Sequence, residues 1–258
     1  MHGVTWKMIE EEKYTKEKSE KKKCTAIVLS AGQGKRMGAS VQKQYIEIEG
    51  NPVIYYTLRA FQKSEIIDEI ILVVGEGQEQ YACTEIVEKY RFTKVVSVVQ
   101  GGAERYDSVW RGLLAAAELR KGKESEEEYI FIHDGARMFV DEAIIEKGYE
   151  TVQKYRACAA GMPSKDTIKL VDKNGFSVQT PERKYVWTVQ TPQIFEKNLI
   201  TEAYRRLMGE QSINVTDDAM VAEQMMNVPV KLYEASYENI KITTPEDLET
   251  AKGFLRRR

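Results

Sequence analysis

Histidine is scarce in this chain, which has only His2 and His133 among its 258 residues. A zinc cluster would have too few ligands, and a Ser-His-Asp or Cys-His relay would have to rest on His133 alone. His133 ends a predicted strand, where a histidine with satisfied hydrogen bonds is favoured over a catalyst. The composition therefore favours chemistry that works without histidine.

Cysteine is also rare, and the three residues, Cys24, Cys83 and Cys158, lie far apart among apolar or helical neighbours. This distribution indicates buried thiols rather than a disulfide framework, which is typical of a reducing compartment. We therefore expect a cytoplasmic protein.

The chain has neither a strong net charge nor a long apolar run. Lys and Arg total 38 against 40 Asp and Glu, so the net charge is -2 and no global basic field attracts nucleic acid. No apolar run approaches the ~18 residues that a membrane span requires. We expect neither nucleic acid nor membrane as a partner, and any anion binding must come from local clusters.

Two regions differ in composition. Residues 1–23 are rich in Lys and Glu and lack the apolar segment of a secretory signal. We interpret them as a charged arm, either a frayed helix or disordered, with a partner-binding tail as the alternative. Residues 24–258 are predicted to form one domain.

Within this domain, short β-branched runs alternate with helical periodicity, which predicts an α/β fold with a mostly parallel sheet and covering helices. The predicted strands are Cys24–Leu29, Glu69–Val74, Lys94–Val98, Tyr129–His133, Cys158–Met162 and a pair near Lys231–Glu234 and Asn239–Ile242. The predicted helices lie near Pro52–Gln62, Gln78–Tyr90, Glu104–Arg120, Glu142–Tyr155, Lys197–Met208 and Asp217–Met226, with a last helix from Pro245.

Residues 164–191 interrupt this alternation. Two alternating segments, 167–171 and 176–180, flank a hairpin turn at Asp172-Lys-Asn-Gly175. A β-arm of this size has too little surface to be stable alone. We expect it to pack on another subunit, with folding back on its own domain as the alternative.

A glycine-rich loop follows the first predicted strand and reads Ser30-Ala-Gly-Gln-Gly-Lys-Arg-Met-Gly38. Its backbone at Ala31, Gly32 and Gly34 can approach phosphate oxygens, and Arg36 supplies positive charge. The spacing matches neither the dinucleotide fingerprint nor the Walker loop. Lys43 lies just beyond the loop, near enough to return a second cation to the same phosphates.

A second glycine pair, Gly101 and Gly102, opens the helix that follows the third strand. An ordinary strand-to-helix turn explains the glycines, but it does not require Arg105 and Ser108 at the loop mouth. We interpret the segment as a second wall of a nucleotide site, where the glycines leave room for a base edge.

The strand ending at His133 is followed by Asp134, Gly135 and Arg137. Ligands of open α/β sheets lie beyond the carboxyl ends of the strands. A carboxylate at Asp134 can hold a ribose hydroxyl, a substrate hydroxyl or Mg²⁺.

Lys241 lies in the alternating segment before the last helix, and an inward-pointing lysine there requires an anionic partner. In contrast, Thr216-Asp-Asp218 is explained as a helix N-cap with acids that complement the helix dipole.

Together these segments resemble the 2-C-methyl-D-erythritol 4-phosphate cytidylyltransferase family, from about Cys24 to Leu255. The resemblance depends on the order and spacing of SAGQGKRMG, KQY near Lys43, GGAERYDSV, HDGAR, SKDTIK, WTVQTPQIF, TDDAM and ENIKITTPEDL. It implies a Rossmann-like domain, a homodimer joined by exchanged β-arms, CTP and a polyol phosphate as substrates, and Mg²⁺ or another divalent cation.

The resemblance also implies roles. Arg36 and Lys43 would stabilise the triphosphate and the charge that develops at the α-phosphorus. The residues that would read cytosine are Gly101, Gly102 and Ser108, with backbone near Gly135. The residues that would position methylerythritol phosphate are Asp134 and Lys241 together with Arg183 and Thr191, the last two on or beside the arm of the other subunit.

Two positions depart from the family pattern. Met138 replaces a frequent proline, which is expected to loosen its loop, and Ala103 replaces a polar residue that often follows the paired glycines. Two other functions remain open: a cytidylyltransferase for another polyol phosphate, such as ribitol 5-phosphate, and a CTP-binding module without turnover.

Overall fold

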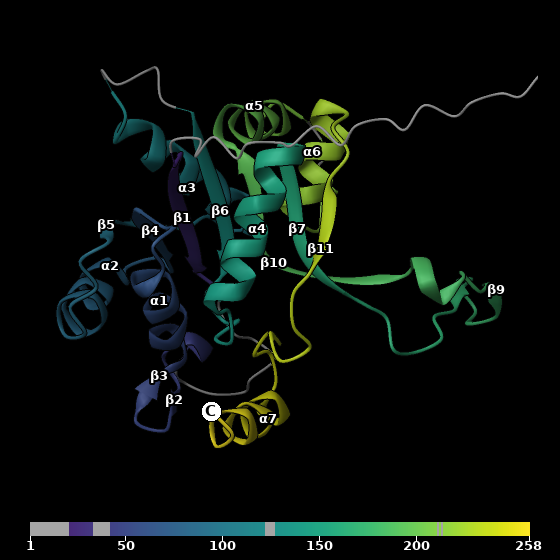
Figure 1. Cartoon of the computed structure of the whole chain (residues 1–258), viewed down its shortest axis with the longest axis horizontal. Helices are drawn as coiled ribbons and strands as arrows, with labels where there is room; N and C mark the ends of the chain where they lie inside the picture. The colour runs from purple at the N-terminus through teal and green to yellow at the C-terminus, as the bar shows by residue number, and fades with distance from the viewer. Residues whose placement is uncertain (1–20, 33–41, 122–126, 211, 213) are drawn as a thin grey trace, which may run out of the picture.

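The computed structural model describes residues 21–32, 42–121, 127–210, 212 and 214–258. Its centre is a seven-stranded sheet with the order β11-β7-β10-β6-β1-β4-β5 (Figure 1). The strands are β1 Lys23–Ser30, β4 Glu69–Val74, β5 Val95–Gln100, β6 Glu128–Asp134, β7 Ala157–Pro163, β10 Trp187–Glu196 and β11 Lys231–Glu234. All pair in parallel except β10, which runs antiparallel to both β6 and β7.

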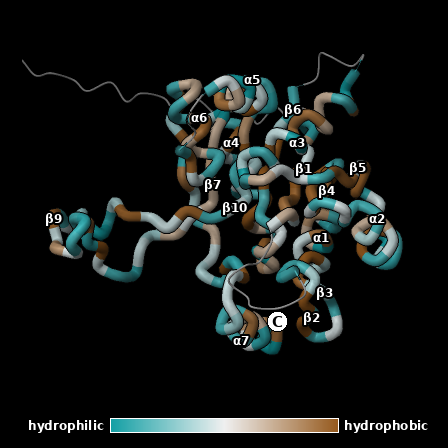
Figure 2. The backbone as a smooth tube through the Cα atoms, turned by 180° about the vertical axis from the view of Figure 1, so that it is seen from behind, coloured by the Kyte–Doolittle hydropathy of each residue, from teal (hydrophilic) through white to brown (hydrophobic). Residues whose placement is uncertain are grey.

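Helices cover both faces of this sheet. One face packs against α1 Val53–Lys63, the π-helix Ala82–Glu88 that continues α2 Glu79–Tyr81, and α4 Glu142–Tyr155. The other face packs against α3 Arg105–Glu118, α5 Lys197–Leu207 and α6 Asp218–Met226. Residues of β1 alternate between the two cores, Val28 in the first and Ile27 in the second, because successive strand side chains point to opposite faces. Hydrophobic residues gather on the central strands in Figure 2.

A smaller third core lies beyond the carboxyl edge of the sheet. There α7 Pro245–Leu255 and the hairpin of β2 Glu47–Ile48 with β3 Asn51–Pro52 pack around residues 136–139. Met138 is buried in this core at 3% exposure. The expectation that Met138 loosens its loop stays a prediction.

The predicted α/β architecture is confirmed, with two differences. The segment 239–242 is not a strand, because no neighbouring strand is available to pair with it; Ile240 and Ile242 alternate because they face the third core. The strand β10 was not expected. Its first residues belong to the exposed end of the arm and its later residues are buried, so it lacks one regular alternation of polar and apolar residues.

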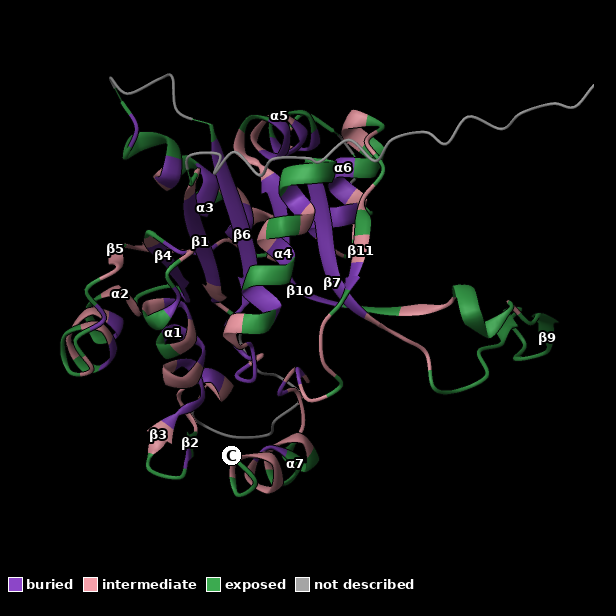
Figure 3. Ribbon diagram, viewed as in Figure 1, coloured by how far each residue is buried: buried purple, intermediate pink, exposed green. Residues whose placement is uncertain are grey.

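Residues 164–186 extend away from the body of the molecule as a hairpin (Figure 1). Its strands β8 Leu170–Val171 and β9 Ser177–Gln179 pair antiparallel, and the Gly175 N–H donates to the Asp172 carbonyl at 3.0 Å. A 3₁₀ turn at Arg183–Tyr185 follows. Figure 3 shows that the arm is largely exposed, and its apolar side chains include Phe176 at 72% and Val178 at 66% exposure.

Among the described residues, none of the helices combines the length and apolar character that crossing a membrane requires. The prediction for the charged arm concerns residues 1–20 almost entirely, which lie outside the described residues; Lys23 already begins β1.

Candidate active site

A cavity of about 410 Å³ opens at the carboxyl ends of β1 and β6. In the sheet, β4 and β5 follow on one side of β1, whereas β6 lies on its other side. The strand order therefore reverses between β1 and β6. The cavity lies at this topological switch point, where α/β sheets bind ligands. Its walls come from the loops after β1 and β5, the start of α3, the end of β6, and two segments near residues 43–44 and 241–243.

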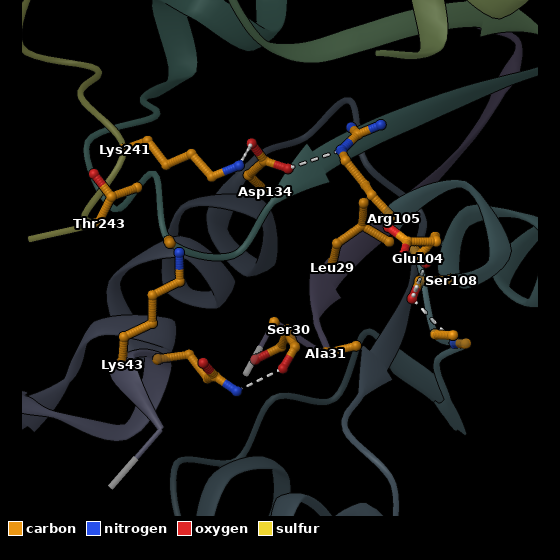
Figure 4. Close-up of a pocket in the computed structure, with 15 residues that line it drawn as sticks. Leu29, Ser30, Ala31, Lys43, Glu104, Arg105, Ser108, Asp134, Lys241 and Thr243 are labelled. Carbon is orange, nitrogen blue, oxygen red and sulfur yellow. Dashed lines mark hydrogen bonds and ion pairs between the residues drawn. The ribbon is translucent and has the colours of Figure 1, made fainter. Parts of the chain in front are cut away.

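Asp134, at the end of β6, is the central group of the cavity (Figure 4). Lys241 Nζ lies 2.9 Å from its Oδ2, Arg105 Nε lies 3.4 Å from Oδ1, and Arg137 Nε lies 3.7 Å from Oδ2. Burial opposes ionisation of this carboxyl group, but the charges of Arg105, Lys241 and Arg137 outweigh it and hold the pKa of Asp134 well below its ordinary value. The anionic partner expected for Lys241 is therefore Asp134.

Two buried residues form the floor beneath Asp134. The Thr191 hydroxyl accepts a hydrogen bond from the Asp134 N–H at 3.0 Å and contacts His133 Nδ1 at 3.1 Å, while His133 Nε2 lies 3.1 Å from the Arg137 carbonyl. A carbonyl can only accept, so Nε2 carries the proton and Nδ1 accepts from Thr191. Burial lowers the pKa of His133 to about 4, which keeps the ring neutral. The interpretation of His133 as a hydrogen-bonded strand-end residue is confirmed.

Arg105 is held from behind by Asp218. Its Nη1 and Nη2 donate to the two Asp218 oxygens at 2.8 and 2.7 Å, a bidentate pair whose carboxylate is fully buried. Tyr204 donates its hydroxyl to the same carboxylate at 2.5 Å. The neighbouring Asp217 caps α6 as expected, by accepting from the Met220 N–H.

The wall after β5 is built by close packing between two loops. A Cβ atom at Gly101 would lie 2.5 Å from the Ala31 Cβ and 2.7 Å from Ser108 Oγ, so only glycine fits there. The Gly102 N–H donates to Ser108 Oγ at 3.1 Å, and Ser108 lines the cavity. Glu104 caps α3 in a capping box with Asp107, and this N-terminus of the helix lines the cavity through Glu104 and Arg105.

The opposite wall carries Lys43, from the 3₁₀ turn Lys43–Tyr45. Figure 4 shows its amino group pointing into the space near Lys241 and Asp134. Ala31 and Gly32 line the cavity, whereas Gly34 and Arg36 lie outside the described residues.

Five of the described residues that the sequence predicted for the site do not line this cavity. Gly101 contributes space rather than contact, and Arg137 lies behind Asp134, where its Nη1 donates to the Asn239 carbonyl at 2.8 Å. The Gly135 N–H donates to the Leu29 carbonyl at 2.8 Å, and its carbonyl accepts from Thr57 at 3.0 Å, so its backbone is committed to the fold rather than to a base.

Thr191 is the fourth, and it lies beside the arm, where β10 enters the body of the molecule. It lies in the buried half of β10 at 3% exposure and bonds to His133 and Asp134 of its own chain. Arg183 is the fifth; it lies on the arm, in the 3₁₀ turn Arg183–Tyr185, and does not line the cavity of its own chain.

Several residues of the site were not expected from the sequence. Thr243, Gln44, Ala136 and Glu104 line the cavity, and Asp218 lies behind it. For Asp218 the helix-cap explanation was sufficient by itself, and its partner Arg105 lies 113 positions away in the sequence. No local pattern therefore pointed to the pair.

The described residues contain no cluster of three or more His, Cys, Asp or Glu side chains that would hold a metal ion. Asp134 is a poor candidate for a ligand, because cations already face both of its oxygens.

The fold and the cavity define an α/β protein with a cation-lined cavity at the switch point of its sheet. The sequence profile of the 2-C-methyl-D-erythritol 4-phosphate cytidylyltransferase family matches residues 24–257. The chain belongs to this family, whose members are nucleotidyltransferases.

Relatives with this name include a protein of Lachnospira eligens, 48% identical over 90% of this chain and 99% of its own length. Another, from Lachnoclostridium phytofermentans, is 46% identical over 91% of this chain and 97% of its own length. Among solved structures, the 4-diphosphocytidyl-2C-methyl-D-erythritol synthase of Anaerococcus prevotii superposes with a TM-score of 0.78 at 33% identity, covering 92% of this chain and all of that one.

Proposed function

We propose that this protein transfers a cytidylyl group from CTP to 2-C-methyl-D-erythritol 4-phosphate, releasing pyrophosphate. One observation carries the proposal: the motifs that match the family, distant in sequence, supply Lys43, Arg105, Asp134 and Lys241 to a single cavity. The relatives named above bear the same activity in their names.

The reaction needs no general base. The attacking phosphate monoester has a second pKa of about 6, so it is largely ionised near neutral pH. The remaining obstacle is electrostatic, because one anion must approach another while charge grows at the α-phosphorus. Cations at fixed positions in the cavity would lower this electrostatic barrier. His133 is neutral and hydrogen-bonded beneath Asp134, so it is not needed as a base.

On the nucleotide side, Lys43 and Arg36 would hold the triphosphate and stabilise the charge that develops. The backbone near Gly102 and the Ser108 hydroxyl would read the cytosine edge. Two observations support these roles. Lys43, Gly102 and Ser108 line the cavity, and Gly101 packs against Ala31, which brings the loops after β1 and β5 together.

On the acceptor side, Asp134 and Lys241 would position the sugar phosphate. The Asp134 carboxylate would accept hydrogen bonds from the hydroxyl groups of the sugar phosphate. Lys241 would exchange its ion pair with Asp134 for one with the phosphate group. Thr191 and Arg137 would act indirectly, by fixing the backbone and charge of Asp134.

A second copy of the chain would complete the site. The arm exposes Phe176, Val178 and Tyr185, the last at 75% exposure, which is costly for a monomer in water. If two arms exchange, Arg183 reaches the acceptor in the partner's cavity. This homodimer is part of the proposal.

A divalent cation is proposed to enter with the nucleotide. Mg²⁺ is commonly bound by substrate phosphates, water and one or two carboxylates rather than by a protein cage. The described residues offer no cluster of ligands for a metal ion, and cations already face both oxygens of Asp134. We therefore assign no step of the reaction to the ion.

The three cysteines are free thiols, and Cys24 and Cys158 are buried. This supports a reducing location, and we propose the cytoplasm.

A pyrophosphate-release assay with CTP tests the activity, using methylerythritol phosphate and ribitol 5-phosphate as competing acceptors. Faster release with methylerythritol phosphate is expected. Faster pyrophosphate release with ribitol 5-phosphate would show that this compound is the acceptor. CTP binding without pyrophosphate release in the presence of either acceptor would show that the protein is a binding module.

A further inference from the structure

Lys241 lies on a segment without regular secondary structure, residues 235–244, yet its amino group reaches Asp134 at 2.9 Å. A lysine on an irregular segment retains its position only if the backbone around it is anchored. The anchor on the carboxyl side is the Ile242 N–H, which donates to the Ala136 carbonyl at 2.9 Å.

The anchor on the amino side is Asn239, two residues before Lys241, and it is fully buried. Its Nδ2 donates both protons, to Gln190 Oε1 at 3.1 Å and to the Thr191 carbonyl at 2.9 Å. Its own carbonyl accepts from Arg137 Nη1 at 2.8 Å.

Two of these partners are the groups that hold Asp134. The Thr191 hydroxyl binds the Asp134 N–H, and Arg137 faces the Asp134 carboxylate. Asn239 therefore links the backbone next to Lys241 to Thr191 and Arg137, the two residues that hold Asp134 in place. Only an amide does this with one short side chain, because a carboxylate donates no hydrogen bond and an alanine makes none.

Resting on the proposed function, we infer that Asn239 is a positioning residue for Lys241 in the use of the sugar phosphate. It touches no substrate and does not line the cavity. It sets the distance between Lys241 and Asp134, and Gln190 supports it by accepting one of its two protons and donating to the Ser236 carbonyl at 2.9 Å.

The test is steady-state kinetics of the full-length enzyme with Asn239→Ala. The KM for the sugar phosphate is expected to rise by about tenfold, the effect of one well-placed hydrogen bond, while the KM for CTP changes by less than about threefold. An equal rise in both values would overturn the inference.

A double-mutant cycle separates positioning from a general loss of structure. If Asn239 acts through Lys241, adding Asn239→Ala to Lys241→Ala should leave the residual kcat/KM unchanged within about twofold. Independent, multiplicative losses would overturn the inference. Wild-type enzyme that releases no pyrophosphate would instead refute the proposed function, so the two failures are distinguishable.

Two further variants guard against unfolding and non-specific effects. Gln190→Met removes one acceptor of Asn239 at similar volume and should raise the same KM less than Asn239→Ala does. The control is Glu238→Gln: Glu238 precedes Asn239, and among the described residues its side chain bonds to Arg257 and Arg258 at the surface, at 3.0 and 3.3 Å. It should leave both KM values unchanged, and a selective rise there would contradict the role of Asn239.

Discussion

At the scale of single residues, Asp134 is a buried carboxylate in a cavity lined by cations. It lies between Arg105 and Lys241, so it offsets the repulsion between their charges. In the proposed reaction, the substrate phosphates would compete with Asp134 for these same groups. The carboxylate would thus hold the cations at fixed positions before the substrates bind.

Lys43 is the described cation expected to matter most for turnover. Lys43→Ala should lower kcat by roughly 10²–10³, as does the loss of one preorganised donor to a developing negative charge. Single-turnover pyrophosphate release measures this step, with Lys121→Ala, an exposed lysine paired with Glu118, as the control. Full-rate turnover by Lys43→Ala would contradict the assignment.

The buried ring of His133 predicts a pH dependence of stability. Its pKa of about 4 lies below the ordinary 6.5, so between these values the unfolded chain binds a proton that the native state does not. The free energy of unfolding should therefore fall as the pH drops from 6.5 to 4, with this residue contributing up to about 1.4 kcal/mol per unit.

Urea unfolding of wild type and His133→Gln across this range measures the effect. The variant should show a flatter dependence on pH, because His2 and every other titrating group are common to both proteins. Parallel curves would show that His133 is protonated in the native state.

At the scale of elements, the loops after β1 and β5 form the proposed nucleotide wall by direct contact. Gly101→Ala would place a methyl group within 2.5 Å of the Ala31 Cβ, so the loops must separate. We expect CTP affinity to fall by at least about tenfold, measured by calorimetric titration. The matched control is Gly253→Ala in α7, where no atom lies within 4 Å; it should leave affinity unchanged.

The arm is the other element with a testable role. If Arg183 acts in the partner's cavity, Arg183→Ala and Lys43→Ala chains expressed together should form mixed dimers with one intact site. Random pairing then restores about a quarter of wild-type activity, although each variant alone is inactive. Mixing Lys43→Ala with Lys241→Ala should restore nothing, because both residues line the same cavity. Equal results from the two mixtures would contradict the exchange of arms.

At the scale of the whole molecule, the two edges of the sheet have different tasks. The carboxyl edge carries the cavity, whereas the amino edge carries a buried ion network. There Glu128 pairs with Arg120 at 3.0 Å and with Lys197 at 3.0 Å, and Arg120 also pairs with Glu69 at 2.6 Å. This network joins β4 and β6 to the start of α5 and to the segment that follows α3.

Arg120→Met should lower the free energy of unfolding by about 3 kcal/mol, because it leaves the buried Glu128 carboxylate with fewer partners. Urea unfolding measures the loss, and kcat should be unchanged because the network lies at the edge opposite the cavity. The exposed neighbour Lys121→Met should have no measurable effect on stability. A large loss of kcat in the folded Arg120 variant would show that the two edges are coupled.

The sequence by itself determined what depends on neighbours along the chain. The period of apolar residues predicted β4 and α4 at their observed bounds, and the turn chemistry of Asp172 and Gly175 predicted the hairpin. The glycine motifs placed the walls of the cavity, because a loop after a parallel strand must open at the carboxyl edge. These features arise from backbone geometry and from hydrogen bonds over a few residues.

The tertiary structure alone decided which distant groups meet. It inserted β10 antiparallel between β6 and β7, placed Thr191 under Asp134 and brought Asp218 beneath Arg105. The segment of Lys241 alternates like a strand, yet it has no strand to pair with and is anchored by Asn239 instead. Such pairings join residues between 48 positions apart, as for Thr191 and Asn239, and 113 positions apart, as for Arg105 and Asp218, and no local period records them.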